Sequence, residues 1–176
     1  MSVFVALDFE TADGSRESAC AVGVVRVEAG RVTARLARLI RPPHLTFSPF
    51  CVRIHGITPA MVADAPDFGQ LWPQIAPLVA GARFLAAHNA AFDRGVLSAC
   101  CRHYGIPIPA LPFVCTVRLS RKAWNLPSAA LPVVCRHLGI PLKHHDAASD
   151  AWACARIVLA IQKDAPELLS PYFDHS

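Results

Sequence analysis

The sequence predicts an α/β fold, a mixed five-stranded sheet with helices on both of its faces. Three strand-like segments come first, and the short turn between the second and third of them requires antiparallel pairing. Farther along, two short strands are each followed by a helical segment, as in sheets that are covered by helices. With 176 residues the chain fits a single domain (1–176), and we expect a core over about 3–162 and a tail at 164–176.

The first three strands form a predicted meander. The first strand begins at Val3 with an apolar run, residues 3–7, rich in β-branched and aromatic residues, as expected for a buried strand. Residues 20–27 and 32–40 are the second and third strands, and the third alternates apolar with polar side chains. Two prolines at 42–43 end this part of the sheet, and residues 47–57 are expected to be extended or irregular.

Helix boundaries are predicted from capping residues. Thr58-Pro59 marks the start of one helix, and Asp67 is the predicted N-cap of another, which ends at Gly81. Ser128 is predicted to cap a helix that runs through Leu138. The other predicted elements are, in chain order, a strand at 83–87, a helix at 90–103, a strand at 113–116, a helical turn or two at 117–123 and a helix at 147–162. The tail contains two prolines and is expected to fray.

Composition argues against several classes of protein. Hydrophobic residues make up 53% of the chain, which argues against disorder, and no apolar run reaches the ~18 residues that a membrane span needs. The N-terminus lacks a signal-peptide pattern, because Asp8 and Glu10 stand where such a peptide needs apolar residues. The seven cysteines include no CxxC pair. We expect them to be reduced thiols in a cytoplasmic protein. A net charge of +4 permits an anionic partner.

Two carboxylates follow the first apolar run. Side chains alternate along a strand, so Asp8 and Glu10 point to the same side and repel each other. A hard divalent cation such as Mg²⁺ or Mn²⁺, which favours oxygen ligands, would stabilise this pair. The pair could equally cap the strand and begin a polar loop.

Two more segments place polar groups beside a predicted helix start. In His88-Asn89-Ala90-Ala91-Phe92-Asp93 the aspartate lies in a first turn, which the helix dipole alone would also favour. In His144-His145-Asp146-Ala147-Ala148-Ser149-Asp150, Asp146 is the expected N-cap, and His145 and Asp150 can reach a common site. A zinc site of His144, His145 and Asp150 is a weaker alternative, because adjacent histidines do not easily bind one ion.

In this order and spacing, Asp8-x-Glu10, His88-Asn89-x-x-Phe92-Asp93 and His145-x4-Asp150 resemble the DEDDh group of 3′–5′ exonucleases. This group includes the proofreading epsilon subunit of bacterial DNA polymerase III and its free-standing homologues. The loop His55-Gly56-Ile57-Thr58 and the segment Cys115-Thr116-Val117-Arg118 are also typical of it. Many members follow Asp-x-Glu with Thr-Thr-Gly, whereas this chain has Thr11-Ala12-Asp13-Gly14.

The resemblance implies a ribonuclease-H-like fold and hydrolysis of nucleic acid from a free 3′ end to nucleoside 5′-monophosphates. It implies two divalent metal ions, Mg²⁺ or Mn²⁺, and His145 as the general base. The implied metal ligands are Asp8, Glu10, Asp93 and Asp150. The residues expected at the substrate are Thr11, Ala12, His55, Ile57, Asn89, Phe92, Arg118 and Arg121.

The substrate is expected to be single-stranded DNA, with short RNA as an alternative. Arg118, Arg121 and Lys122 form a basic cluster beside Trp124, which predicts either a path for a single strand or a solvated helix face. A role in replication or repair would need a polymerase or replication partner. A non-catalytic module that binds nucleic acid or a polymerase is the alternative from another class. It would be expected to have lost one of the four acids or the histidine, and all five are present.

Overall fold

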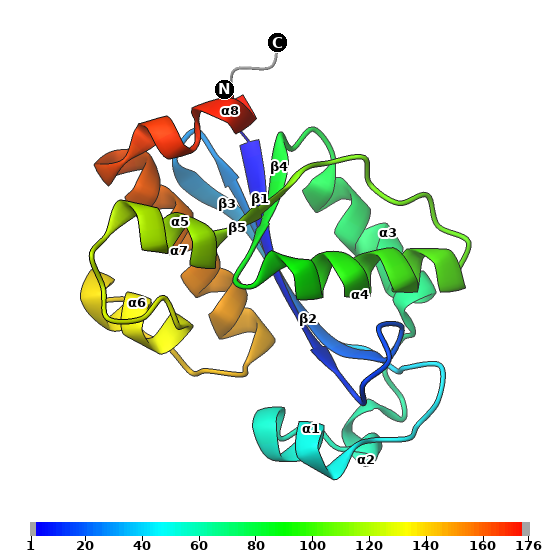
Figure 1. Cartoon of the computed structure of the whole chain (residues 1–176). Helices are drawn as coiled ribbons and strands as arrows, with labels where there is room; N and C mark the ends of the chain where they lie inside the picture. Colours follow the sequence, from blue (N-terminus) through cyan, green and yellow to red (C-terminus); the bar gives the residue numbers. More distant parts are fainter. Residues whose placement is uncertain (1–2, 174–176) are drawn as a thin grey trace.

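The computed structural model describes residues 3–173, and a five-stranded sheet in the order β3-β2-β1-β4-β5 runs through its middle (Figure 1). The central strand β1 (Val3–Thr11) pairs antiparallel with β2 (Ala19–Glu28) and parallel with β4 (Phe84–Ala87). On the outer sides, β3 (Arg31–Leu39) pairs antiparallel with β2, and β5 (Phe113–Cys115) pairs parallel with β4. The mixed five-stranded sheet predicted from the sequence is confirmed.

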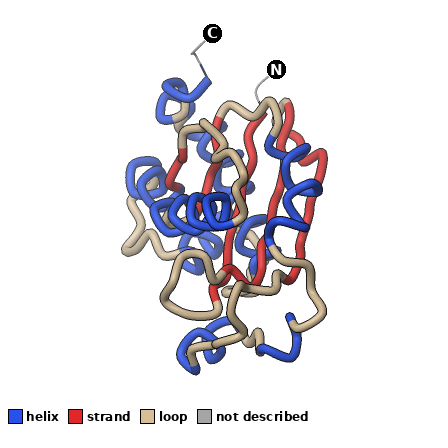
Figure 2. Tube along the Cα trace, turned by 90° about the vertical axis from the view of Figure 1, so that its right-hand side faces the viewer, coloured by secondary structure: helices blue, strands red, loops and turns tan. Residues whose placement is uncertain are grey.

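Helices cover both faces of the sheet, as predicted. On one face lie α3 (Phe68–Val79) and α4 (Ala90–His103), and they pack on the strands through one apolar core. On the other face lie α5 (Thr116–Ala123), α6 (Leu131–Leu138) and α7 (Ala147–Asp164), packed through a second core. The turned view shows the strands side by side, with helices around them (Figure 2).

Strand β1 explains why there are two cores. Phe4 and Ala6 point into the core beneath α7, whereas Val5 and Leu7 point into the core beneath α3 and α4. Because side chains alternate along a strand, a strand buried on both faces needs a continuous apolar sequence. The buried strand predicted from the apolar run at the start of β1 is confirmed.

The segment 47–57, expected to be irregular, contains a helix, so that prediction is wrong. This helix, α1 (Pro49–His55), begins at Ser48, whose side chain accepts a hydrogen bond from the Phe50 amide. It ends at Gly56, whose φ of 75° lies in the left-handed region that glycine adopts without strain. The sequence carried this signal as Ser-Pro at the start and glycine at the end.

A second short helix, α2 (Pro59–Val62), follows, and α1 and α2 project together from one end of the sheet (Figure 1). Its predicted start at Thr58-Pro59 is confirmed, although the Thr58 side chain makes no capping hydrogen bond. The capping role of Asp67 is also confirmed: it forms a reciprocal capping box with Gln70 at the start of α3.

The predicted cap at Ser128 is wrong. The N-cap of α6 is Ala130, and the Ser128 hydroxyl accepts a hydrogen bond from the Ala130 amide in the turn before the helix. A serine two residues ahead of a helix can make such a local turn just as well as a cap, which explains the shift.

The C-terminal segment is also more ordered than expected. After α7 come a 3₁₀ helix at Pro166–Leu168 (η1) and a short helix at Ser170–Phe173 (α8). Leu169 is fully buried, and the rings of Tyr172 and Phe173 pack on Phe84, with centroids 5.7 and 5.2 Å away. The prediction of fraying is wrong up to residue 173, and residues 174–176 of the predicted tail lie outside the described part. Within residues 3–173, the structure contains no helix with the length and apolarity that a membrane crossing requires.

Candidate active site

Three carboxylates meet where α7 crosses the sheet. Asp8 and Glu10 lie in the C-terminal half of β1. Helix α7 packs across β1 and β2, and Asp150 lies in its first turn. One oxygen atom from each of these three carboxylates lies within 4.8 Å of the others. The structure therefore brings together three of the four acids that the sequence singled out.

Asp93 reaches the same place from the opposite core. Strand β4 pairs only with residues 4–6 of β1, so the later part of β1 is not covered by a strand on that side. Asp93, in the first turn of α4, is 1% exposed, and its Oδ1 accepts a hydrogen bond of 3.0 Å from the Phe9 amide. A favourable position in the helix dipole does not require this burial or this contact. Asp93 is thus attached to β1 between Asp8 and Glu10.

The four acids disfavour one another's ionised forms. Burial, followed by the charges of Asp93, Asp150 and Glu10, raises the pKa of Asp8 well above its usual range. Burial, followed by Asp150 and Asp93, raises the pKa of Glu10 to about 8. Burial also raises the pKa of Asp93 to about 7 and the pKa of Asp150, against the hydrogen bonds that each accepts. Such crowding of anionic oxygens is the electrostatic setting that a bound cation relieves.

The arrangement of Asp150 fits a divalent cation. Its Oδ2 accepts hydrogen bonds from the His145 amide at 3.0 Å and from Nδ1 of His144 at 2.9 Å. Its Oδ1 is buried and has no hydrogen-bond partner within residues 3–173. An oxygen that is buried without a partner beside two other carboxylates has the chemistry of a ligand for Mg²⁺ or Mn²⁺.

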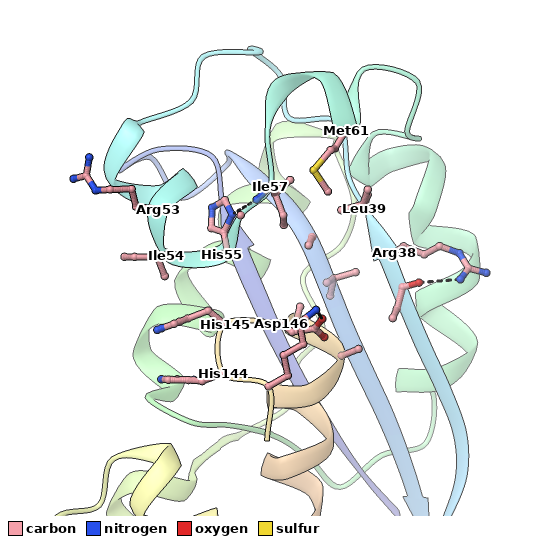
Figure 3. Close-up of a pocket in the computed structure, with 17 residues that line it drawn as sticks. Arg38, Leu39, Arg53, Ile54, His55, Ile57, Met61, His144, His145 and Asp146 are labelled. Atoms are coloured by element: carbon pink, nitrogen blue, oxygen red, sulfur yellow. Dashed lines mark hydrogen bonds and ion pairs between the residues drawn. The ribbon is translucent and has the colours of Figure 1, made fainter. Parts of the chain in front are cut away.

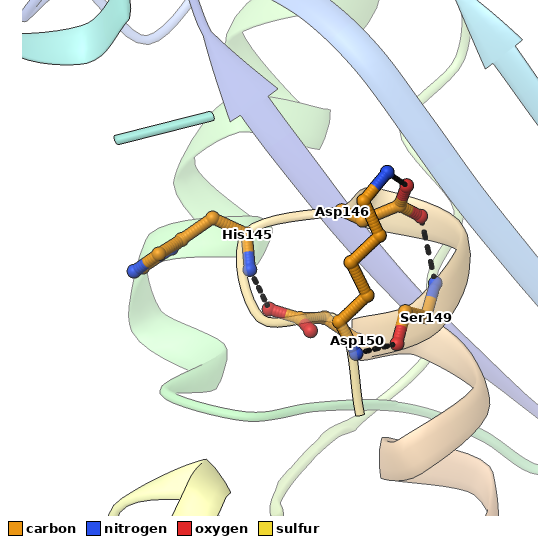
Figure 4. A network of polar contacts seen from close by, with 5 residues as sticks. His145, Asp146, Ser149 and Asp150 are labelled. Atoms are coloured by element: carbon orange, nitrogen blue, oxygen red, sulfur yellow. Dashed lines mark hydrogen bonds and ion pairs between the residues drawn. The ribbon is translucent and has the colours of Figure 1, made fainter. Parts of the chain in front are cut away.

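A network of polar contacts holds the loop that precedes α7 (Figure 4). Asp146 is the N-cap of α7, as predicted: its Oδ1 accepts a hydrogen bond of 3.1 Å from the Ser149 amide. Its Oδ2 forms an ion pair of 3.0 Å with Lys143, and the Lys143 amide donates to the Ser149 hydroxyl at 2.8 Å. The loop therefore meets the first turn of α7 in one fixed arrangement.

The two adjacent histidines of this loop project in the same direction. His145 has a φ of 64°, in the left-handed region that non-glycine residues rarely adopt. Its ring stacks on the ring of His144, with centroids 3.8 Å apart and planes inclined by 22° (Figure 3). Burial, followed by the neighbouring His144, lowers the pKa of His145, so the neutral ring predominates near pH 7.

His55, the last residue of α1, connects that helix to the end of β1. Its Nδ1 accepts a hydrogen bond of 3.0 Å from the Ile57 amide, so its Nε2–H is the donor to the Thr11 carbonyl at 3.1 Å. At the other end of α1, the Ser48 amide donates to the Ala12 carbonyl at 2.8 Å. Both ends of α1 are thus attached to the two residues that follow Glu10.

Two cavities flank α1. One, of about 390 Å³, lies between α1 and the acids, and its lining includes Glu10, Thr11, Phe50, His55 and Phe92. The other, of about 580 Å³, lies on the side of the histidine loop (Figure 3). Its lining includes Arg38, Arg53, His55, Ile57, His144 and His145.

The residues predicted to bind substrate are distributed over the two cavities and their surroundings. Thr11, His55 and Phe92 line the smaller cavity, and Ile57 lines the larger one. Asn89 is exposed in a left-handed conformation, with φ 75°, where β4 turns into α4. Ala12 is fully buried in a small core, which argues against a contact between its side chain and a substrate.

The basic cluster lies elsewhere. Arg118 and Lys122 line a third cavity, of about 250 Å³, together with β5 and the C-terminal segment. Arg121 is exposed on the same helix, α5. The Trp124 ring lies against His137, and its Nε1–H donates to Asp164 at 3.2 Å, so it is engaged within the fold. The structure therefore favours a solvated helix face over a path that leads to the acids.

Arg16, in the loop after β1, is a further residue beside the site, and it belongs to none of the sequence motifs. Its guanidinium group lies over the Phe92 ring, 4.6 Å from the centroid, and donates to the Phe92 carbonyl at 3.3 Å. Its charge also opposes the rise in the pKa of Asp93. The only signal in the sequence was a basic residue in the loop that follows Asp-x-Glu, and loops contain many such residues.

Comparison with known proteins identifies the family of this chain. Residues 5–158 match the family model RNase_T, described as an exonuclease. A Mycobacterium tuberculosis protein named as a bifunctional exonuclease/endonuclease is 33% identical over 172 residues, which are 91% of this chain and 26% of that protein. A PolC-type DNA polymerase III from Bacillus cereus is 27% identical over 97% of this chain and 12% of its own length. Exodeoxyribonuclease 10 of Escherichia coli K12 is 32% identical over 88% of this chain and 66% of its own length.

The chain therefore spans about a quarter of the first of these relatives and about an eighth of the second. Among solved structures, exonuclease X in complex with 5′ overhanging duplex DNA has a TM-score of 0.75 and 26% identity, over 93% of both chains. Exonuclease I has a TM-score of 0.83 and 20% identity over 99% of this chain and 44% of its own, and it shows the same ribonuclease-H-like fold. Because the family model matches residues 5–158, from β1 into α7, the chain belongs to the RNase_T exonuclease family.

Proposed function

We propose that this protein is a metal-dependent exonuclease that removes nucleoside 5′-monophosphates from the 3′ end of single-stranded DNA. The observation that carries the proposal is the meeting of Asp8, Glu10 and Asp150, with oxygen atoms within 4.8 Å of one another. Asp93, attached to the Phe9 amide, completes the set of four acids. A deoxyribonucleic acid substrate is supported by the similarity to exodeoxyribonuclease 10.

In this proposal Asp8, Glu10, Asp93 and Asp150 hold two divalent ions, Mg²⁺ or Mn²⁺. When bound, such ions neutralise the phosphodiester and lower the pKa of a coordinated water. The protein contributes fixed, crowded carboxylates. The unpartnered Oδ1 of Asp150 and the raised pKa values of Asp8 and Glu10 support this role.

His145 is the proposed general base, and it takes the proton of the attacking water. Its main chain is fixed by the hydrogen bond from its amide to Asp150, while its ring lines the open cavity of about 580 Å³. A base must be neutral to accept a proton, and the lowered pKa of His145 favours the neutral ring.

The cavity of about 390 Å³ is the proposed site of the terminal nucleotide. It places the apolar side chains of Phe50, Ile54 and Phe92 next to Glu10, so a base and a reacting phosphate would be held side by side. The neighbouring Thr11–Asp13 loop and Asn89 would hold the 3′ end. Helix α1, which lines this cavity, is attached at both of its ends to the residues that follow Glu10.

A polymerase partner is proposed only from similarity to the PolC-type DNA polymerase III, in which a segment like this chain is part of a much longer protein. Similarity to one segment of that protein does not transfer its partners to this chain. The proposed chemistry of the site does not depend on a partner.

The proposed function is tested with a single-stranded DNA oligonucleotide in Mg²⁺. We expect nucleoside 5′-monophosphates as products, resistance of a strand with a 3′-phosphate, and no effect of a 5′-phosphate. Asp8→Asn serves as the inactive control, and its circular dichroism spectrum should match that of the parent protein. Cleavage of a circular single strand, or degradation from the 5′ end, would contradict the proposal.

A further inference from the structure

We propose that His144 is a positioning residue, which orients Asp150 as a metal ligand and supports the ring of His145. This inference rests on the proposed function of the site. The resemblance to the DEDDh group singled out His145, yet in the structure it is the His144 ring that contacts the Asp150 carboxylate.

The first step concerns the rotation of the Asp150 carboxylate. The His145 amide contacts Oδ2 at 3.0 Å, and one donor leaves the carboxylate plane free to turn about that contact. The Nδ1–H group of His144 donates to the same Oδ2 at 2.9 Å from a second direction. Two donors on one oxygen fix the plane, and Oδ1 is then left buried and without a partner among the described residues. One oxygen of this carboxylate lies within 4.8 Å of oxygens of Asp8 and Glu10. Outer hydrogen bonds of this kind commonly tune metal affinity.

The second step concerns the ring of His145. Because His145 has a φ of 64°, its side chain lies alongside that of the preceding residue instead of diverging from it. The rings are stacked at 3.8 Å, so His144 occupies one face of the His145 imidazole and limits its rotation. The Nδ1–H bond to Asp150 in turn holds the His144 ring in place. One residue therefore couples the orientation of a metal ligand with that of the proposed base.

The stacked geometry also argues against a shared zinc ion. Zinc ligands surround the ion tetrahedrally, so two histidine rings must direct their nitrogen lone pairs toward one point. Ligand atoms of His144, His145 and Asp150 do lie within 4.8 Å of one another. The two rings, however, stack with planes inclined by only 22°, and Nδ1 of His144 is already bonded to Asp150, which leaves that ring only Nε2 for a metal. The geometry suits a pair in which one ring supports the other.

Three substitutions separate the two contributions of His144. His144→Asn keeps an N–H donor close to the position of Nδ1 but removes the ring, and His144→Phe keeps a stacking ring but removes the donor. His144→Ala removes both. His103→Asn is the matched control, because His103 is exposed at the far end of α4, about ten residues or ~15 Å along the helix from Asp93.

The first measurement is Mn²⁺ affinity, followed by electron paramagnetic resonance in the absence of DNA. We expect His144→Ala and His144→Phe to weaken Mn²⁺ binding by about 10- to 100-fold, the usual effect of losing an outer hydrogen bond to a ligand. His144→Asn should recover most of the affinity, and His103→Asn should equal the parent protein. Equal affinity in His144→Ala and the parent, or no recovery in His144→Asn, would overturn the proposal.

The second measurement is turnover at saturating Mn²⁺, which removes the difference in metal affinity. Here His144→Phe should exceed His144→Asn in kcat, because only the aromatic ring supports His145. The reverse order would overturn the second step. A tightly bound zinc ion that both His144→Ala and His145→Ala lose would make His144 a ligand and would also overturn the proposal. If the parent protein shows no exonuclease activity while the Mn²⁺ results hold, the proposed function fails and the positioning role stands.

Discussion

Gly23 of β2 lies directly against the first turn of α7: a Cβ atom at this position would be 2.0 Å from the carbonyl oxygen of Ala147. Gly23 also pairs with Asp8 across the β1–β2 ladder. The lack of a side chain at one residue thus allows the helix that carries Asp150 to approach the strand that carries Asp8. The distance between these two carboxylates therefore depends on a residue that has no side chain of its own.

The first prediction follows from this contact. Gly23→Ala must displace backbone atoms of α7, since its new methyl group meets a carbonyl group and not a flexible side chain. We expect a loss of about 1–3 kcal/mol in the free energy of unfolding, the usual cost of overpacking, and a loss of activity larger than the fraction unfolded explains. Urea unfolding and initial rates measure the two effects.

Gly95→Ala is the control for this substitution. Gly95 lies inside α4, and its new Cβ would be 3.4 Å from the Arg16 side chain, which is ordinary van der Waals contact. Alanine is a better helix former than glycine, so the stability should hold or rise by up to about 1 kcal/mol. A Gly23→Ala protein as stable and active as Gly95→Ala would show that α7 can shift without cost.

The second prediction concerns pH and the metal-free protein. The pKa of Glu10 is about 8 in the folded chain and 4.5 ordinarily, so the folded state binds this proton more tightly than the unfolded state does. Stability contributed by the protonated group is complete below about 4.5 and is lost as the pH rises toward 8. In a chelator, the melting temperature should therefore fall across this interval, and Mg²⁺ should restore it.

Glu10→Gln should flatten this decline, because glutamine stays neutral throughout. Glu167→Gln, which changes an exposed glutamate of the C-terminal segment, should leave the decline as in the parent protein. If the melting temperature of metal-free Glu10→Gln falls across this interval as steeply as that of the parent protein, Glu10 does not carry the raised pKa in solution.

The third prediction concerns the attachment of α1. His55→Ala removes the hydrogen bonds from the Ile57 amide and to the Thr11 carbonyl, at 3.0 and 3.1 Å. We expect a loss of about 1–3 kcal/mol in stability, at about 0.5–1.5 kcal/mol for each bond. The KM for a single strand should rise more than kcat falls, because the freed helix borders the proposed nucleotide cavity. An unchanged KM with reduced stability would restrict His55 to a structural role.

Local rules explain why much of this site was predictable. Alternation along a strand placed Asp8 and Glu10 on one side, and capping rules placed Asp146 before Asp150. Features that depend on tertiary contacts were not predictable in this way. The stacking of His144 on His145 needs a left-handed backbone at a non-glycine residue, and the burial of Leu169 needs a distant strand end to pack against. The Ser48-Pro49 start of α1 is a local capping signal, but prolines at 42, 43, 49 and 59 also fit an irregular segment.

The fourth prediction tests His145 as the base. His145→Ala should reduce the rate by about 10²–10⁴-fold, the usual effect of a positioned general base, while Mn²⁺ binding survives because the four acids remain. In the parent protein the rate should rise with pH as the ring loses its proton. Burial and His144 lower the pKa of His145 from 6.5, so this rise should be centred below 6.5. Metal ions nearby would move it lower still. His145→Ala should lack that limb of the profile, although metal-bound water can still titrate at higher pH. If the mutant keeps the acid limb with the parent's midpoint, the group that accepts the proton is not His145, and the assignment of the base is wrong.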